Sequence, residues 1–329
     1  MSQEVEEKMH KIRNKRDLSS LDLCSIDDVT PDDIDLICDV AKGFKEAGNK
    51  KYSLLKDTTI FNAFFENSTR TRSSFELAGK KLGSDVINIS GDSSSVKKHE
   101  TLLDTAEVLN SMRPEVIVTR SSKEGFPHLL RRHVNASVLN AGDGQNEHPT
   151  QALLDYFTIK EHFEDISGHT VLIVGDILHS RVARSQIKLF LKYKLKIRLA
   201  APLTFIPRRI EELFPVKIYN NIEEALKGVD IVSTLRVQEE RGAEGLIPTL
   251  REFSKTFGIS KKRFALANKG AILMHPGPLM RDVEVHHALV ASSRSTYFRQ
   301  VENGLAVRSA LLWLFARRED GKNKQINLI

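Results

Sequence analysis

Short apolar segments alternate along this chain with segments whose apolar residues recur at the spacing of an α-helix. Residues 115–119 (EVIVT), 170–174 (TVLIV) and 230–234 (DIVST) are examples of the first kind. Such short, largely apolar runs are typical of strands buried inside a parallel sheet. Parallel strands need crossover connections, which helices usually provide. The alternation therefore predicts an α/β fold.

The length of the chain indicates that this alternation builds more than one sheet. The sequence has 329 residues, which is about twice the length of a common single domain. We therefore predict two doubly wound parallel-sheet domains with the active site in the cleft between them. Strands are predicted at residues 57–65, 85–89, 115–119, 134–140, 170–174, 196–200, 230–234 and 271–274. Helices are predicted at residues 73–82, 101–109, 150–163, 184–192, 222–226 and 304–315.

The composition argues against several classes of protein. The net charge of +6 is spread along the chain, without a basic stretch interleaved with aromatic residues, so no nucleic-acid partner is expected. The two cysteines, Cys24 and Cys38, form no CxxC pair. This excludes a disulfide framework, argues against a cysteine zinc site and fits a reducing, cytoplasmic compartment. No apolar run reaches the roughly 18 residues of a membrane span, and residues 1–17 lack the apolar core of a secretory signal.

A run of hydroxyl and guanidinium side chains follows the first predicted strand, in the sequence ENSTRTR at residues 66–72. Its hydroxyl side chains are those of Ser68, Thr69 and Thr71. They stand where a helix begins, and the unpaired backbone N–H groups and dipole of a helix N-terminus favour an anion. Arg70 adds a planar fork that suits phosphate oxygens. The alternative is a helix-capping box formed by Ser73 and Glu76, but the paired arginines favour a phosphate site.

This run resembles the carbamoyl phosphate loop of the carbamoyltransferase family, and the resemblance extends from about residue 18 to residue 314. The further matching motifs are SSSVKKHET at residues 93–101, His148-Pro149-Thr150-Gln151, the glycine-aspartate element that leads to Arg181, Arg236-Val237-Gln238 and His275-Pro276-Gly277-Pro278. The resemblance implies a carbamoyl phosphate-binding domain at residues 18–149 plus 305–329. It also implies an aspartate-binding domain at residues 150–304, with residues 1–17 as a charged tail.

The later motifs resemble the aspartate branch of the family. A lysine at Lys98 is similar to that branch, whereas ornithine enzymes carry an aspartate and a Ser-Met-Gly run in place of Arg236-Val237-Gln238. HPGP also stands where ornithine enzymes have a cysteine-bearing motif. Charge agrees, because two substrate carboxylates need cations such as Lys98, Arg181 and Arg236. The resemblance thus implies carbamoyl transfer from carbamoyl phosphate to L-aspartate, an early step of pyrimidine biosynthesis.

The chemistry implied by this resemblance needs neither a covalent nucleophile, a metal nor a cofactor. Charge develops on the carbonyl oxygen and on the leaving phosphate, so positioned donors suffice. By resemblance, carbamoyl phosphate is bound by Ser68, Thr69, Arg70, Thr71, Arg120, His148, Gln151 and the backbone of Gly277 and Pro278. The catalytic residues implied are Arg70, Thr71, Lys98, Arg120 and His148. Taken alone, Arg120 could be a surface arginine and His148 a turn residue.

Aspartate recognition and domain closure are also implied by the resemblance. The aspartate carboxylates are expected to meet Lys98, Arg181, Arg236 and Gln238. Glu66 resembles a domain-bridging glutamate whose partners are Arg181 and Arg241, although Arg70 or Arg72 could pair with it instead. Residues 236–264 are predicted to form a mobile lid.

The loop around Ser94 and Lys98 resembles one that reaches into the active site of a neighbouring subunit. This implies a homotrimer with shared sites. The sequence leaves open whether such a trimer acts alone, joins a regulatory chain or pairs with dihydroorotase. Two alternatives stay open: an ornithine-type or other amine carbamoyltransferase, and an inactive homologue that serves as a scaffold. A dinucleotide-binding dehydrogenase is set aside, because residues 171–176 (VLIVGD) lack the GxGxxG fingerprint.

Overall fold

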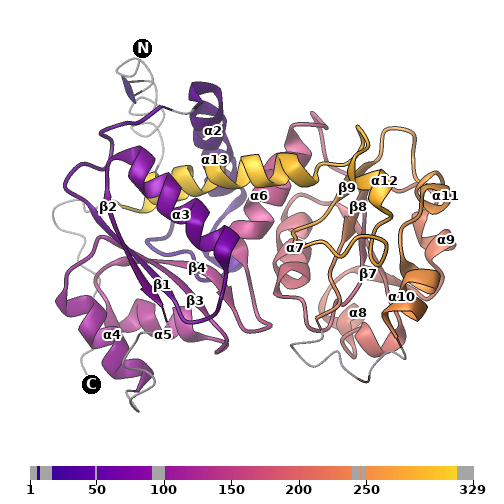
Figure 1. Cartoon of the computed structure of the whole chain (residues 1–329), viewed down its shortest axis with the longest axis horizontal. Coiled ribbons are helices and arrows are strands. Elements are labelled where there is room, and N and C mark those ends of the chain that lie inside the picture. Colours follow the sequence, from indigo (N-terminus) through magenta and orange to yellow (C-terminus); the bar gives the residue numbers. More distant parts are fainter. Residues whose placement is uncertain are drawn as a thin grey trace. The chain divides into compact units, whose positions relative to one another are not determined.

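Two parallel sheets organise the chain in a computed structural model that describes residues 6–7, 17–48, 50–90, 101–238, 245 and 249–316 (Figure 1). The chain divides into two units, Met1–Leu153 with Asn303–Ile329, and Leu154–Glu302. The division points fall inside two helices, α6 (Pro149–Lys160) and α13 (Tyr297–Phe315). None of the helices in the described ranges is long and apolar enough to cross a membrane.

The first unit contains a four-stranded sheet in the order β2-β1-β3-β4, with every pair parallel. Its strands are β1 (Thr59–Phe64), β2 (Asp85–Ser90), β3 (Val116–Ser121) and β4 (Ser137–Asp143). The chain adds β2 on one side of β1 and then β3 and β4 on the other side. The direction of winding therefore reverses between β1 and β3, and ligands of open parallel sheets bind at such a reversal.

Helices cover both faces of this sheet (Figure 1). Besides α6 and α13, they are α2 (Pro31–Ala47), α3 (Thr69–Leu82), α4 (Leu102–Ser111) and α5 (Phe126–His133), with the short η1 (Ile26–Asp28). On one face, Phe61 and Ile117 of the sheet form a buried cluster with Leu109 of α4 and Phe126 of α5. These two helices lie side by side beneath the sheet in Figure 1, opposite α3.

The second unit contains a five-stranded parallel sheet in the order β7-β6-β5-β8-β9. Its strands are β5 (Thr170–Val174), β6 (Lys196–Ala200), β7 (Val216–Tyr219), β8 (Ile231–Thr234) and β9 (Ile272–Met274). Its other helices are α7 (Arg181–Lys192), η4 (Leu203–Phe205), α8 (Ile210–Leu213), α9 (Ile222–Leu226), α10 (Leu250–Phe257), α11 (Lys261–Phe264) and α12 (His287–Val290). Here the winding reverses between β5 and β8.

The prediction of two parallel-sheet α/β domains is confirmed, with differences in individual elements. Strand β7 and helices α2, α5, α8, α10, α11 and α12 were not predicted. Helix α2 nevertheless carries a strong start signal, because Thr30 and Asp33 form a reciprocal capping box around Pro31. The predicted lid at 236–264 is wrong over its last part, because α10 and α11 lie within it. Thr249 caps α10, and Phe253 and Phe257 are buried on one side of that helix.

Gly175, at the end of β5, lets the backbone of Leu235 approach more closely than any amino acid with a Cβ would allow. Its φ is +127°, and a Cβ there would lie 2.5 Å from the backbone oxygen of Leu235. We expect Gly175→Ala to lower the free energy of unfolding by at least about 2 kcal/mol, because both the backbone strain and the collision must be relieved. Gly228→Ala is the control, since Gly228 also has a positive φ (+69°) but has open space around it. Equal losses in urea unfolding would contradict this account.

Candidate active site

The first candidate region lies at the carboxyl ends of β1 and β3, where the winding of the first sheet reverses. Phe64 of β1 pairs with Arg120 of β3, and the Phe65 N–H donates a 2.8 Å hydrogen bond to the Arg120 carbonyl. The loops that follow the two strands therefore start side by side and leave in opposite directions. The predicted phosphate loop and Arg120 thus come from adjacent strand ends.

Helix α3 begins at Thr69, four residues earlier than the predicted start at 73. Ser68 occupies the N-cap position in an extended conformation, and no side-chain cap hydrogen bond is made there within the described loop. The N–H groups of the first turn of α3 thus end at the predicted phosphate loop, with Thr71 buried and Arg70 exposed. The capping-box alternative is wrong, because Ser73 lies inside the helix.

Arg120 is held by two groups of the same unit. Its guanidinium donates a 2.9 Å hydrogen bond to the Glu66 carboxylate and a 3.3 Å hydrogen bond to the Ala141 carbonyl. The ion pair is largely shielded, with the two side chains 12% and 23% exposed. Glu66 therefore lies against an arginine that is predicted to bind phosphate. Its predicted role in domain closure stays a prediction, and one of its predicted partners, Arg241, lies outside the described residues.

The turn that leads from β4 to His148 is organised by one buried carboxylate, that of Asp143. It accepts hydrogen bonds from the Asn140 and Asn146 side chains (2.9 and 3.0 Å) and from the Gly125 and Glu147 N–H groups (2.9 and 3.0 Å). Because the acceptor is fully buried and has four donors, the turn is fixed where it precedes α6.

His148 and Gln151 lie at the start of α6 and are both buried. The His148 carbonyl accepts from the Gln151 N–H at 3.0 Å, which places His148 at the cap of the helix. Its ring Nδ1 lies 3.4 Å from the Thr150 hydroxyl. The carboxyl ends of β1, β3 and β4 therefore lead in turn to the predicted phosphate loop, to Arg120 and to the His148 turn.

The second candidate region lies at the winding reversal of the second sheet, after β5 and β8. The fully buried carboxylate of Asp176, which follows β5, accepts a 3.1 Å hydrogen bond from the Gln238 N–H, beyond β8. It also accepts from the His179 ring at 2.8 Å. The Arg236 guanidinium donates to the Gln238 side-chain oxygen at 3.2 Å. Two predicted aspartate ligands are thus brought together beside the turn that leads to α7.

Arg181 is the first residue of α7, and its side chain is 2% exposed. The helix is capped by Ser180, whose hydroxyl accepts from the Ala183 N–H at 3.1 Å. Arg181 is therefore a buried arginine at the turn between β5 and α7, and its contact with aspartate stays a prediction.

The HPGP segment follows β9, the neighbour of β8, and its fold depends on His275. The Gly277 N–H donates to His275 Nδ1 at 2.8 Å, so that the ring proton lies on Nε2. That nitrogen lies 3.8 Å from the carboxylate of Glu284, which accepts from the Met280 N–H at 2.8 Å. Glu284 is 2% exposed, and burial raises the pKa of its carboxyl to about 7. The HPGP segment therefore packs against the buried carboxyl group of Glu284.

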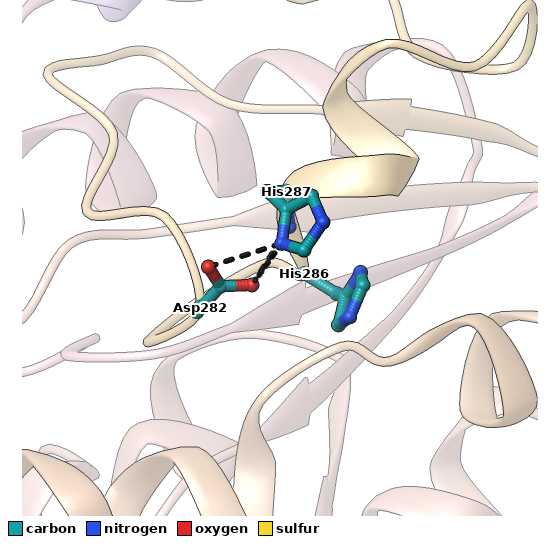
Figure 2. Close-up of side chains that lie close together, drawn as sticks. All are labelled: Asp282, His286 and His287. Carbon is teal, nitrogen blue, oxygen red and sulfur yellow. Dashed lines mark hydrogen bonds and ion pairs between the residues drawn. The ribbon is translucent and has the colours of Figure 1, made fainter.

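A group of metal-binding side chain types occurs just beyond this segment. Figure 2 shows the Asp282 carboxylate facing the His287 ring, with His286 beside it. Their ligand atoms lie within 4.8 Å of one another, the one such group among the described residues. Asp282 also accepts from the His287 N–H at 2.9 Å, and these hydrogen bonds with His287 hold the pKa of the Asp282 carboxyl below its usual value. These hydrogen bonds close a tight, exposed turn, and they explain why the three side chains lie together.

The predicted substrate-binding residues that the structure describes divide between the two units, with one set in each. The first set contains Ser68, Thr69, Arg70, Thr71, Arg120, His148 and Gln151, and the second contains Arg181, Arg236, Gln238, Gly277 and Pro278. Ser94, Lys98 and Arg241 lie outside the described residues, so their roles stay predictions. Sequence reasoning missed the supporting carboxylates Asp143 and Glu284. For Asp143 the available signal was an acidic residue inside a glycine-rich turn, whereas Glu284 lies in a charged stretch and carries no such signal.

Comparison with known proteins assigns a family to both halves of the chain. Residues 21–161 match the carbamoyl-P binding domain of aspartate/ornithine carbamoyltransferases, and residues 167–315 match their Asp/Orn binding domain. The aspartate carbamoyltransferase catalytic subunit of Ruminiclostridium cellulolyticum is 47% identical over 304 residues, which cover 92% of this chain and 97% of that protein. The corresponding subunit of Gluconobacter oxydans is 52% identical over 258 residues, or 78% of this chain and 82% of that protein.

Solved structures show the same similarity. Aspartate transcarbamoylase from Trypanosoma cruzi, in complex with carbamoyl phosphate and aspartate, is 30% identical with a TM-score of 0.82, covering 91% of this chain and 98% of that one. Ornithine carbamoyltransferase from Thermus thermophilus is 26% identical with a TM-score of 0.81, covering 91% of this chain and 99% of that one. Structural likeness therefore extends to both branches, whereas the two sequence relatives described above carry the aspartate name.

The raised pKa of Glu284 predicts a dependence of stability on pH. The folded chain holds the Glu284 proton more tightly than the unfolded chain, in which the pKa of this carboxyl has its ordinary value of 4.5. The stabilisation is thus complete below that value and is lost as pH rises through about 7. We expect Glu284→Gln to flatten the decline in the free energy of unfolding across this range in urea titrations. Glu223→Gln, which removes a surface partner of Arg263, should leave the decline in place. An unchanged decline in Glu284→Gln would contradict the assignment.

Proposed function

Because the chain belongs to the aspartate/ornithine carbamoyltransferase family, we propose that it transfers the carbamoyl group of carbamoyl phosphate to the amino group of L-aspartate. The products are N-carbamoyl-L-aspartate and phosphate, as in an early step of pyrimidine biosynthesis. The observation that carries the choice of aspartate is the Arg236–Gln238 pair at the reversal of the second sheet. A guanidinium fork there suits a carboxylate better than the ammonium group of ornithine.

The first unit supplies the groups that bind carbamoyl phosphate. The phosphate lies at the N-terminus of α3, where Ser68, Thr69 and Thr71 add hydroxyl donors and Arg70 adds a cation. Backbone N–H groups and the helix dipole stabilise the negative charge, which increases as the phosphate leaves. These donors are in place before the reaction, so the charge is stabilised without reorganisation of the site.

Arg120 and His148 act on the carbonyl oxygen of the carbamoyl group, together with the Thr71 hydroxyl. In the structure Arg120 is paired with Glu66, so phosphate must compete with a carboxylate for the same guanidinium. Substrate binding would then release Glu66 for a cation of the second unit, for which Arg181 and Arg241 are the candidates. This change in the partner of Glu66 provides a physical reason for the two domains to close when carbamoyl phosphate binds.

The second unit supplies the groups that bind aspartate. Arg181, Arg236 and Gln238 meet the two carboxylates and orient the amino group, while Gln151 and the carbonyls of Gly277 and Pro278 hold the carbamoyl nitrogen. The neutral amine then forms a C–N bond to the carbonyl carbon as the C–O bond to phosphate breaks. The proton that the amine loses leaves with the phosphate. Orientation and charge stabilisation carry this reaction without a cofactor.

A homotrimer with shared active sites is part of this proposal. Ser94 and Lys98 lie in the segment that joins β2 to α4, and in the proposal they complete the site of a neighbouring subunit. Large apolar side chains are exposed on the two elements that flank this segment in the sequence, with Ile87 of β2 at 48%, Val108 of α4 at 50% and Met112, just after α4, at 51%. Strand β2 is also an edge of its sheet. Such an apolar edge supports burial against another copy of the chain.

The cellular setting is proposed from two buried cysteine thiols, Cys24 and Cys38. Such thiols are compatible with a reducing cytoplasm. A regulatory chain or a dihydroorotase partner would bind outside the active site.

The first test is the reaction itself. Purified chain, given carbamoyl phosphate with either L-aspartate or L-ornithine, should form carbamoylated product with aspartate alone in a colorimetric assay. Arg70→Ala should lower kcat by about 100-fold or more, since it removes a donor to the charge that develops on phosphate. Product from ornithine alone would reject the aspartate assignment, and near-normal turnover by Arg70→Ala would reject the phosphate loop.

The shared site predicts complementation between two impaired chains. Arg236→Ala should raise the KM for aspartate by about 30-fold or more through loss of a charged hydrogen-bonded contact, and Lys98→Ala should abolish turnover. Mixed trimers of the two variants should regain activity, because some sites then draw intact residues from different chains. Hybrid trimers that form, as shown by ion-exchange separation, but stay inactive would argue against a shared site.

A further inference from the structure

A buried carboxylate of the second unit, that of Asp155 on α6, is bound by two glutamine side chains. One of its oxygens accepts from Gln186 Nε2 of α7, and the other accepts from Gln300 Nε2 of α13, both at 2.7 Å. Asp155 and Gln186 are fully buried and Gln300 is 3% exposed. Burial makes each of these hydrogen bonds strong and makes their loss costly.

Each glutamine side chain also accepts a hydrogen bond from a residue at or just after the end of a strand. Gln186 Oε1 accepts from the hydroxyl of Ser233 in β8 at 3.0 Å, and Gln300 Oε1 accepts from the backbone N–H of His275 at 2.9 Å. Ser233 precedes Arg236 by three residues, and His275 precedes Gly277 by two. Gln186 itself belongs to the helix that begins at Arg181. One carboxylate is thus joined to every segment of this unit that carries a predicted aspartate or carbamoyl ligand.

The direction of the hydrogen bonds shows why a carboxylate stands at the centre. The His275 N–H can only donate, so Gln300 must turn its oxygen toward it and its amide nitrogen toward Asp155. Gln186 also presents its nitrogen to Asp155. A carboxylate can accept from two amide nitrogens at once, whereas an asparagine offers one acceptor and one donor.

We propose that Asp155 is a positioning residue for the amino acid site, where it fixes the ends of β8 and β9 through Gln186 and Gln300. This inference rests on the proposed function and goes beyond the residues that touch substrate. Aspartate and the carbamoyl nitrogen are held by groups on two neighbouring strand ends, so a small shift between those ends misplaces the attacking amine.

Exchanging the carboxylate of Asp155 and the amide of Gln300 tests which of the two must donate and which must accept. Gln300→Glu places two buried carboxylates face to face and should raise the KM for aspartate about 10-fold or more, with a much smaller change in the KM for carbamoyl phosphate. The double variant Asp155→Asn with Gln300→Glu keeps shape and net charge. In it, the asparagine nitrogen donates to the new carboxylate, whose other oxygen still accepts from His275 N–H. We expect its KM for aspartate to return to within about 3-fold of the original value.

The control is Thr158→Val on the same helix, which removes a buried 2.7 Å hydrogen bond from Thr158 to the Leu154 carbonyl. It should lower thermal stability without a change in the KM for aspartate. If the double variant fails to recover, or if Gln300→Glu leaves the KM unchanged, the positioning role is overturned while turnover of aspartate still supports the proposed function. An unsubstituted chain that neither turns over aspartate nor binds it in calorimetry would instead refute the proposed function.

Discussion

The reversal of strand order within each parallel sheet is the constraint on which the rest of the structure depends. All strand carboxyl ends lie on one edge, and at a reversal the next loops diverge and leave room for a ligand. In the first sheet this point lies between Phe64 and Arg120, and in the second it lies where Gly175 meets Leu235. The predicted binding residues that the structure describes follow the strands at these two points or the strands next to them.

Buried carboxylates hold the loops at these points in place. Asp143 fixes the turn before His148, Asp176 fixes the backbone at Gln238, and Asp155 fixes the ends of two strands. A carboxylate accepts several hydrogen bonds and donates none, so it orders donors from separate segments around one centre. The desolvation of such a charge is offset by those hydrogen bonds, and the result is a rigid support for loops without regular structure of their own.

In the proposed function, recognition of anions is divided between backbone and side chains. The N-terminus of α3 offers N–H groups and a dipole, while Arg70 and Arg120 offer full charges. The contact between Arg120 and Glu66 shows that one of these charges is already compensated inside the same unit. In the proposal, the Glu66 carboxylate and the substrate phosphate compete for the Arg120 guanidinium. Because the two anions cannot occupy the same position on it, binding of phosphate is coupled to movement of Glu66.

The sequence by itself determined the α/β class, both parallel sheets and most of the residues that contact substrate in the proposal. These features are local, because apolar runs, turn residues and motifs such as STRTR keep their meaning without knowledge of distant contacts. The start of α3 at Thr69, the pairing of Arg120 with Glu66 and the network around Asp155 were decided by tertiary structure. Asp155 and Gln300 are 145 residues apart, and no local pattern shows that two buried polar groups so far apart share hydrogen bonds. Only the folded chain brings such partners together and excludes the water that would otherwise take their place.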